Sequence, residues 1–274
     1  NAAGRLDDMR LGIQCLLAGE NEAITIAQSL HDLNIERRSI ESSMQDEALV
    51  SLNEIAVGDQ YSISLFEPTW HQGVVGILAS RIKEQYHRPV IAFAEVEDGL
   101  LKGSGRSIAG LHLRDALDMV TKRYPNLIIT FGGHAMAAGL SIEQSRFFDF
   151  QAAFEKIVRT LLTPADLQAI IQTDGGFSAD EMTLHHAQLI AHQVWGQGFI
   201  PPLFNDLFTV ITQRVVGGKH LKLLLEKQGK RFDAIYFGQT ALLGDEIEAV
   251  YQLQVNHYNN VQSLQLQLLH VLNA

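Results

Sequence analysis

The sequence is poor in the features that define secreted and membrane proteins. Its 274 residues include a single cysteine, Cys15, so no disulfide can form within the chain. Such scarcity fits a reducing compartment, and we expect a cytoplasmic protein with Cys15 as a packing residue. No apolar run approaches the ~20 residues that cross a bilayer, so we expect no contact with a membrane.

Positive charge is also scarce. There are 21 Lys and Arg residues against 31 Asp and Glu residues, which gives a formal charge of −10. Nucleic-acid-binding proteins usually have a basic balance, so the total charge argues against a general nucleic-acid binder. Salt screens charges beyond about 10 Å, however, so a local basic patch can still bind an anion. The chain also begins without an initiator Met, and we expect it to be a piece of a longer protein.

The first half of the sequence predicts an α/β domain. Apolar residues recur every three or four positions from residue 20 to about 49, which predicts one long helix. Two shorter helices broken near Asn34 are the alternative. Strand and helix patterns then alternate, and this order predicts a mixed sheet. The expected strands are 61–66, 89–96, 100–108 and 127–131, and the expected helices are 73–86, 113–123 and 147–162.

The period of the apolar residues changes to two in the second half, after a predicted boundary at Thr163-Pro164. Lys222 and His220 should point away from three buried leucines at 221, 223 and 225, because strand side chains alternate. Five short antiparallel strands suit a small barrel such as the oligonucleotide-binding (OB) fold. The expected strands are 207–216, 220–226, 231–237, 247–255 and 263–271.

Two glycine-rich segments carry groups that can bind phosphate. Gly132, Gly133 and His134 follow a predicted strand, and a glycine turn can present amide donors and an imidazole to an oxyanion. Ser104 and Arg106 are two residues apart, so on a strand both face one side, where a guanidinium matches phosphate geometry. The alternatives are a plain glycine turn with a structural histidine and a solvated arginine in a bulge.

A third segment, Trp70-His71-Gln72-Gly73, leads into the helix expected at 73–86. Free amides at a helix N-terminus attract anions, which makes this segment another candidate for phosphate binding. Trp70 could stack on a base, but most such aromatic residues are structural, and we expect it in the core.

A basic stretch marks the predicted barrel. Six cations and one anion, Glu226, give residues 214–231 a local charge of +5. This stretch could bind a nucleic-acid backbone, with Phe199, Phe204 or Tyr236 available for base stacking. A solvated basic hairpin is the alternative. The six cations are Arg214, Lys219, Lys222, Lys227, Lys230 and Arg231.

Taken in order, these segments resemble the RecJ family of single-stranded-DNA exonucleases in the DHH phosphoesterase superfamily. The resemblance includes the opening Asn-Ala-Ala-Gly-Arg-Leu, Trp-His-x-Gly-Val-x-Gly, Ser-Gly-Arg-Ser and Gly-Gly-His-x-x-Ala-Ala-Gly. It extends through Trp-Gly-Gln-Gly-Phe at 195–199 and the segment 214–223, so it covers nearly the whole chain.

The resemblance implies that the intact enzyme hydrolyses single-stranded DNA from 5′ to 3′ in recombination and repair. Two Mn²⁺ or Mg²⁺ ions would be bound by an N-terminal domain with an Asp-His-His triplet. This sequence has no such triplet, so we expect no metal site and no hydrolysis by this chain alone. His185-His186 follows Leu184 and is expected to be a helix-surface pair.

The resemblance also assigns roles to the phosphate-binding candidates. His134 would lie against the scissile phosphate, and Arg5, Ser104 and Arg106 would hold the 5′ end, next to the backbone of Gly132 and Gly133.

The implied organisation has three parts: residues 1–50 end the catalytic domain and form a linker helix, 51–163 form a DHH-associated domain, and 164–274 form an OB domain. Expected partners are single-stranded DNA, the missing catalytic domain, and a single-strand-binding protein or helicase. Two alternatives stay open. One is a stand-alone module that binds single strands, and the other is a phosphodiesterase of short oligonucleotides or cyclic dinucleotides, which the barrel disfavours.

Overall fold

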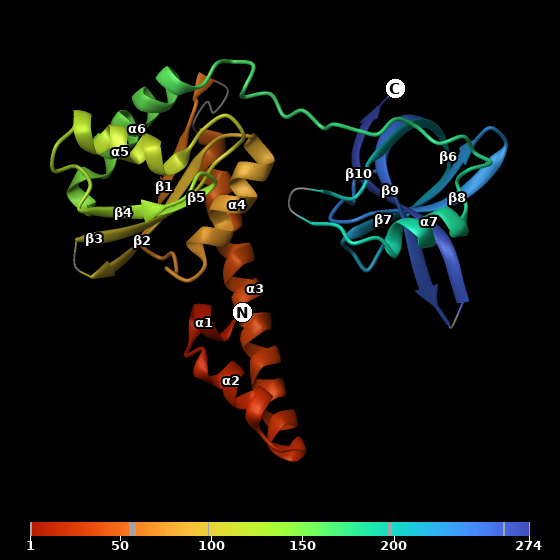
Figure 1. Cartoon of the computed structure of the whole chain (residues 1–274), viewed down its shortest axis with the longest axis horizontal. Helices are drawn as coiled ribbons and strands as arrows, with labels where there is room; N and C mark the ends of the chain where they lie inside the picture. Colours follow the sequence, from red (N-terminus) through yellow and green to blue (C-terminus); the bar gives the residue numbers. More distant parts are fainter. Residues whose placement is uncertain (1, 55–58, 98, 197–198, 260, 274) are drawn as a thin grey trace. The chain divides into compact units, whose positions relative to one another are not determined.

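The computed structural model describes residues 2–54, 59–97, 99–196, 199–259 and 261–273. It divides into two compact units, Asn1–Ala169 and Ile170–Ala274, called here the N-terminal unit and the C-terminal unit. The N-terminal unit has two hydrophobic cores, one on each face of its sheet, and the C-terminal unit has a core of its own. Figure 1 shows both units with their helices and strands labelled.

The N-terminal unit begins with two short helices, α1 (Ala3–Leu6) and α2 (Arg10–Leu17), followed by the 35-residue helix α3 (Glu20–Glu54). The prediction of one long helix is confirmed. Arg37 donates to Asn34 at 2.7 Å and to Glu41 at 2.6 Å, so side-chain bonds span the position where a break was the alternative. Among the described residues no helix, α3 included, is both long and apolar enough to span a membrane.

The predicted mixed sheet forms the centre of this unit and has five strands, one more than expected. Its strand order is β1-β2-β3-β5-β4, with β1 and β2 parallel and the other pairs antiparallel. The strands are β1 (Ile63–Phe66), β2 (Val90–Glu97), β3 (Leu100–Arg106), β4 (Thr130–Gly133) and β5 (Ala137–Glu143). The helices are α4 (Val75–Tyr86), α5 (Leu113–Arg123) and α6 (Phe147–Leu161), with a 3₁₀ turn, η2, at Gln144–Arg146.

Both faces of the sheet are covered. Along β2, Ile91 and Phe93 pack in the core with α5 and α6, whereas Val90 and Ala92 pack in the core with α3 and α4. Figure 1 shows α5 and α6 together on one side of the sheet and α4 on the other. Period-two alternation in an apolar strand therefore builds two cores.

Two details of the sheet differ from the prediction. The strand expected at 127–131 begins only at Thr130, because Asn126 turns through a left-handed conformation (φ 64°) and Leu127 enters the core as part of a connection. Strand β5 was not predicted at all, since its first three residues are Ala137, Ala138 and Gly139, which have low strand propensity.

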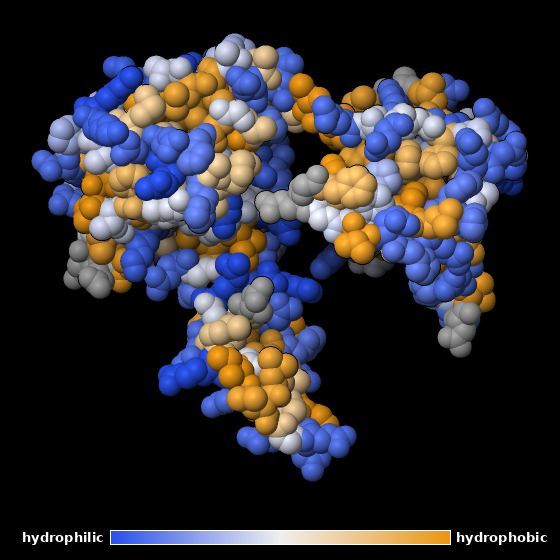
Figure 2. Space-filling view, in the orientation of Figure 1, coloured by the Kyte–Doolittle hydropathy of each residue, from blue (hydrophilic) through white to orange (hydrophobic). Residues whose placement is uncertain are grey.

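The outer surface of α2 is apolar. Met9 and Ile13 are each 51% exposed, and Leu16 and Leu17 are more than 80% exposed. Figure 2 shows hydrophobic side chains gathered over this helix. An apolar patch of this kind marks a surface that packs against another element.

The C-terminal unit contains a closed five-stranded barrel with the order β10-β8-β7-β6-β9, and the predicted OB barrel is confirmed. One pairing, β8 with β10, is parallel rather than antiparallel. Leu221, Leu223 and Leu225 are at most 2% exposed, as strand alternation predicts. The elements are α7 (Leu184–Ala191), β6 (Phe204–Val216), β7 (His220–Lys227), β8 (Lys230–Tyr236), β9 (Glu246–Tyr258) and β10 (Val261–Asn273).

Candidate nucleic-acid interface

Ser104 and Arg106 lie on the α4 face of β3. Gly103 and Gly105 face the opposite core, where a Cβ at Gly103 would lie 2.6 Å from a ring carbon of Phe93. Arg106 Nη1 donates to Ser104 Oγ at 3.2 Å and to the carbonyl of Gly105 at 2.8 Å. The glycines thus let the strand pack closely, and the two polar side chains stay on one face, as the spacing predicted.

The first turn of α4 meets these two side chains. A Cβ on Gly76 would lie 2.9 Å from Ser104 Oγ and 3.1 Å from Arg106 Nη2. Val74, the N-cap residue, makes no side-chain capping bond. A hydroxyl and a guanidinium therefore lie beside a helix N-terminus, a position that favours negative charge.

Arg5 adds a second guanidinium. Its Nη1 donates to the carbonyl of Gly73 at 3.0 Å, and a Cβ on Gly73 would lie only 2.0 Å from the Arg5 carbonyl oxygen, so only glycine fits there. Burial lowers the pKa of Arg106, and the charge of Arg5 lowers it further. In the part of the chain that the structure describes, neither arginine forms a salt bridge. Two guanidinium groups that repel each other can bind an anion such as phosphate.

The turn with His134 joins β4 and β5. Gly133 has φ +141°, and a Cβ there would lie 2.5 Å from the carbonyl oxygen of Ala137, so the turn requires glycine. The backbone N–H of His134 donates to this same carbonyl at 2.8 Å. Ala137 pairs with Arg106 across β5 and β3, which places the turn at the end of the sheet where Arg106 lies. The imidazole of His134 is exposed.

A row of glycines crosses the sheet beside Ser104. Ser104 pairs with Gly139 on β5, and Gly139 pairs with Gly132 on β4. Both glycines are exposed. The backbone is therefore open to a ligand next to the serine hydroxyl. The sequence analysis missed this row, because it did not recognise β5 as a strand. The small residues repeated at the start of β5 were the feature that could have revealed it.

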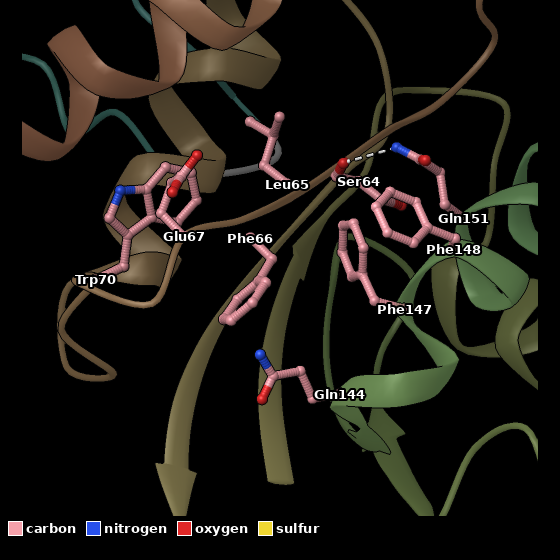
Figure 3. A pocket seen from close by; sticks show the side chains of 9 residues that line it. All are labelled: Ser64, Leu65, Phe66, Glu67, Trp70, Gln144, Phe147, Phe148 and Gln151. Atoms are coloured by element: carbon pink, nitrogen blue, oxygen red, sulfur yellow. Dashed lines mark hydrogen bonds between the residues drawn. The ribbon is translucent and has the colours of Figure 1, made fainter. Parts of the chain in front are cut away.

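A separate cavity of about 400 Å³ lies beside β1 and the start of α6. Figure 3 shows Phe66, Phe147 and Phe148 lining it, with Gln151 donating to the carbonyl of Ser64. Trp70 also lines it but is only 3% exposed and donates to Glu47 at 3.0 Å, so the prediction that Trp70 is a core residue is confirmed.

The six cations of the C-terminal unit fall into two groups. Three of them pair with acids: Lys227 with Asp206, Lys230 with Asp180, and Arg231 with Glu226 at 3.4 Å. Lys227 also donates to the carbonyl of Phe177, and its side chain is only 14% exposed. Lys227 therefore has a structural bond that the sequence did not reveal.

The remaining three cations, Arg214, Lys219 and Lys222, form no salt bridge within the described residues. Arg214 and Lys222 are direct partners across β6 and β7, on the side opposite the buried leucines. Like charges in this position destabilise a sheet, so a bound anion would relieve their repulsion.

The three aromatic candidates for base stacking differ in access. Phe204 is 8% exposed and packs in the barrel core, and burial raises the pKa of the half-buried Tyr236. Phe199 is 66% exposed and lies 5.0 Å from the ring of Trp195. The Gln197-Gly198 dipeptide of that motif lies outside the described residues.

The adjacent histidines of α7 show no metal-site geometry. His186 Nδ1 is within hydrogen-bond distance of two oxygens, the carbonyl of Glu181 at 2.6 Å and the hydroxyl of Thr183 at 3.1 Å. Both belong to the segment that leads into α7. Over the described ranges, no group of three or more His, Cys, Asp or Glu residues could hold a metal ion.

Comparison with known proteins defines the class first. Residues 58–160 match the DHHA1 domain, and residues 173–270 match the RecJ OB domain. The N-terminal unit thus carries a DHH-associated domain, and the barrel is an OB domain of the RecJ type.

The chain is similar over nearly its whole length to one part of RecJ proteins. It is 48% identical over 278 residues to the single-stranded-DNA-specific exonuclease RecJ of Salmonella typhimurium, covering 97% of this chain and 48% of that protein. Crystal structures of Thermus thermophilus RecJ with Mg²⁺ and with Mn²⁺ both match with a TM-score of 0.78, at 26% and 27% identity. The match to the Mg²⁺ structure covers 99% of this chain and 41% of the Thermus chain. The match to the Mn²⁺ structure covers 100% of this chain and 40% of the Thermus chain. The chain therefore spans about half the length of the curated relatives that it matches.

Proposed function

We propose that this chain is part of a metal-dependent exonuclease that hydrolyses single-stranded DNA from 5′ to 3′ in recombination and repair. Its own contribution is to bind the substrate phosphate and the strand. The observation that carries the proposal is the approach of Arg5 and Arg106 to Ser104 and the start of α4, where the described residues form no salt bridge with either arginine. The relatives named as single-stranded-DNA-specific exonucleases support this reading of the site.

In this proposal each polar group of the N-terminal unit has a defined role. Arg5, Arg106 and Ser104 bind the phosphate at the 5′ end of the strand, and the open backbone of Gly132 and Gly133 contacts the next phosphate. His134 is the catalytic residue of this chain and donates from its imidazole to the scissile phosphate. A donor in this position stabilises the charge that develops in the transition state.

The metal ions belong to a part of the protein outside this sequence. Thermus RecJ has been crystallised with Mg²⁺ and with Mn²⁺, which supports either ion as the cofactor of the intact enzyme. Bound metal would supply a hydroxide nucleophile at neutral pH and neutralise charge on the phosphate.

Three segments have separate roles in this proposal. Residues 1–50 complete the catalytic domain, link it to the rest and supply Arg5. Residues 51–163 supply the other phosphate-binding groups, and residues 164–274 bind the strand. The catalytic domain itself is the partner of the apolar surface of α2. Single-stranded DNA is the substrate, a single-strand-binding protein or a helicase delivers it, and the enzyme works in the cytoplasm.

The test compares this chain with its Arg106→Ala variant on a labelled single strand with a 5′-phosphate or a 5′-hydroxyl. The wild-type chain should bind the phosphorylated strand more tightly and leave it uncut in the presence of Mn²⁺. Arg106→Ala should remove this preference, whereas Arg114→Ala, an exposed arginine at the start of α5, should keep it. Equal affinity of the wild-type chain for the two strands would contradict the phosphate site. Cleavage by the purified chain would contradict the division of labour, and binding without activity in the full-length protein would favour a stand-alone binding module.

A further inference from the structure

An aromatic pair lies at one end of the barrel, on the outside of β7. His220 is the first residue of β7, and Phe237 directly follows β8. Their ring centroids are 5.0 Å apart with the planes at 83°, and Phe237 is 50% exposed. Sequence patterns offer no signal for this pair, because one residue begins β7 and the other follows β8.

The imidazole of His220 is held in a fixed orientation. The backbone N–H of Gly238 donates to His220 Nδ1 at 3.0 Å, and Gly238 reaches this position with φ +72°, a conformation that favours glycine. Because Nδ1 accepts this bond, the neutral ring carries its proton on Nε2. That N–H remains able to donate to a ligand beside the exposed ring of Phe237.

The two facing cations, Arg214 and Lys222, lie next to this aromatic pair. Val216 of β6 pairs with His220 of β7, and Arg214 of β6 pairs with Lys222 of β7. The two cross-strand pairs are therefore neighbours along these strands. His220 and Lys222 are two residues apart and therefore share the outer face, about 7 Å from each other along the strand. One patch of the barrel thus presents two rings beside two positive charges.

Together, the aromatic pair and the two cations indicate a more specific ligand than either feature would indicate alone. A single exposed phenylalanine is common on protein surfaces. Two facing cations that form no salt bridge within the described residues, however, favour an anion, and a neighbouring aromatic surface favours a planar ring. Single-stranded nucleic acid has both groups in every repeating unit.

We propose that Phe237 and His220 bind one nucleobase of a single strand while Arg214 and Lys222 bind the adjacent phosphate. This inference rests on the proposed function, since it names the barrel residues that contact the strand. The base stacks on Phe237, and His220 supports the stack edge-on and donates from Nε2. The cations make a contact that depends on salt, whereas the aromatic contact does not.

The test uses the 274-residue chain with a short oligothymidine and with an abasic strand of the same length. Phe237→Ala and Phe237→Leu should each weaken oligothymidine binding roughly tenfold, leave its salt dependence unchanged, and have no effect on the abasic strand. Tyr258→Ala removes another exposed aromatic ring of this unit and should leave both affinities unchanged. Arg214→Ala with Lys222→Ala should flatten the salt dependence on both strands by roughly 0.7 to 1.4 in log–log slope.

The outcomes separate this inference from the proposed function. If the Phe237 variants bind oligothymidine like the wild type while the cation variant flattens the slope, the base site is wrong and the barrel still binds the strand. An equal loss on the abasic strand would also overturn the base site. If neither set of variants changes binding, the base site and the proposed role of the barrel both fail.

Discussion

Gly76 leaves room for the guanidinium of Arg106, since a Cβ at this position in α4 would lie 3.1 Å from Arg106 Nη2 and 2.9 Å from Ser104 Oγ. The close approach joins a helix N-terminus to the two polar side chains of β3. The proposed anion site therefore depends on close packing at a glycine, which has no side chain of its own to bind a ligand.

Gly76→Ala should displace Arg106 and Ser104 and lower the affinity for a 5′-phosphorylated strand about tenfold, roughly the loss of one charged hydrogen bond. The free energy of unfolding should change by less than about 1 kcal/mol, because alanine favours a helix and the displaced guanidinium is the end of a flexible side chain. Gly12→Ala on α2, where the new Cβ would meet only Met9 at 3.8 Å, is the control. Binding titrations and a urea melt measure both quantities, and unchanged affinity for the phosphorylated strand would contradict the assignment.

Lys227→Ala should destabilise the C-terminal unit by about 3–5 kcal/mol, because it breaks a largely buried ion pair and leaves Asp206 without its cation. Asp206 would keep its bonds from the Tyr251 hydroxyl at 2.7 Å and the Phe177 amide at 3.0 Å. Lys230→Ala, whose partner Asp180 is exposed, should cost at most about 1 kcal/mol. Chemical denaturation measures the difference, and equal small losses in both variants would show that the Lys227 pair is not structural.

Tyr251 should make the barrel sensitive to alkaline pH. Burial raises the pKa of its hydroxyl, and the hydrogen bond to Asp206 raises it further. The raised pKa stabilises the folded state fully below the ordinary value near 10, and this contribution is lost as the pH rises above 10, where the unfolded tyrosine ionises first. The free energy of unfolding should therefore fall by up to about 1.4 kcal/mol per pH unit more in the wild type than in Tyr251→Phe. Parallel pH profiles for the two proteins would contradict this role.

Local patterns in the sequence predicted the long α3 helix, the mixed sheet and the barrel, because each depends on a periodicity of apolar residues within one element. The burial of three leucines opposite Lys222 followed from the same rule. The predicted phosphate-binding residues Ser104 and Arg106 share a face, since their spacing fixes this on any strand.

These local patterns could not predict contacts between segments that are distant in the sequence. The basic stretch looked like one surface, but Lys227 pairs with Asp206 on a neighbouring strand and Lys230 pairs with Asp180, fifty residues away. Strand β5 owes its place to pairing with β3 and β4 rather than to its own residues. The contact between Phe237 and His220 likewise depends on the register of β7 with β8.

Lys219→Ala with Lys222→Ala should weaken binding to all single-stranded sequences and flatten the slope of log affinity against log salt by roughly 1.4, because each lost phosphate contact contributes about 0.7. The melting temperature should hardly change, since exposed substitutions usually shift stability by less than about 0.5 kcal/mol. Lys230→Ala with Arg231→Ala, which removes two cations already paired with acids, should flatten the slope less. Fluorescence anisotropy at several salt concentrations measures the slopes, and an unchanged slope in the first variant would remove these lysines from the strand contact.

The most direct test of the account is His134→Ala in the full-length enzyme, assayed for turnover and for affinity on the same single strand. A donor that faces only the scissile phosphate stabilises charge that develops during the reaction, so turnover should fall about 10²–10³-fold. Affinity for the strand should stay within about twofold of the wild type, because the proposed function assigns the remaining phosphate contacts to Arg5, Arg106 and the barrel. Near-normal turnover, or a loss of affinity as large as the loss of turnover, would contradict the proposal that this chain brings a catalytic group to the phosphate.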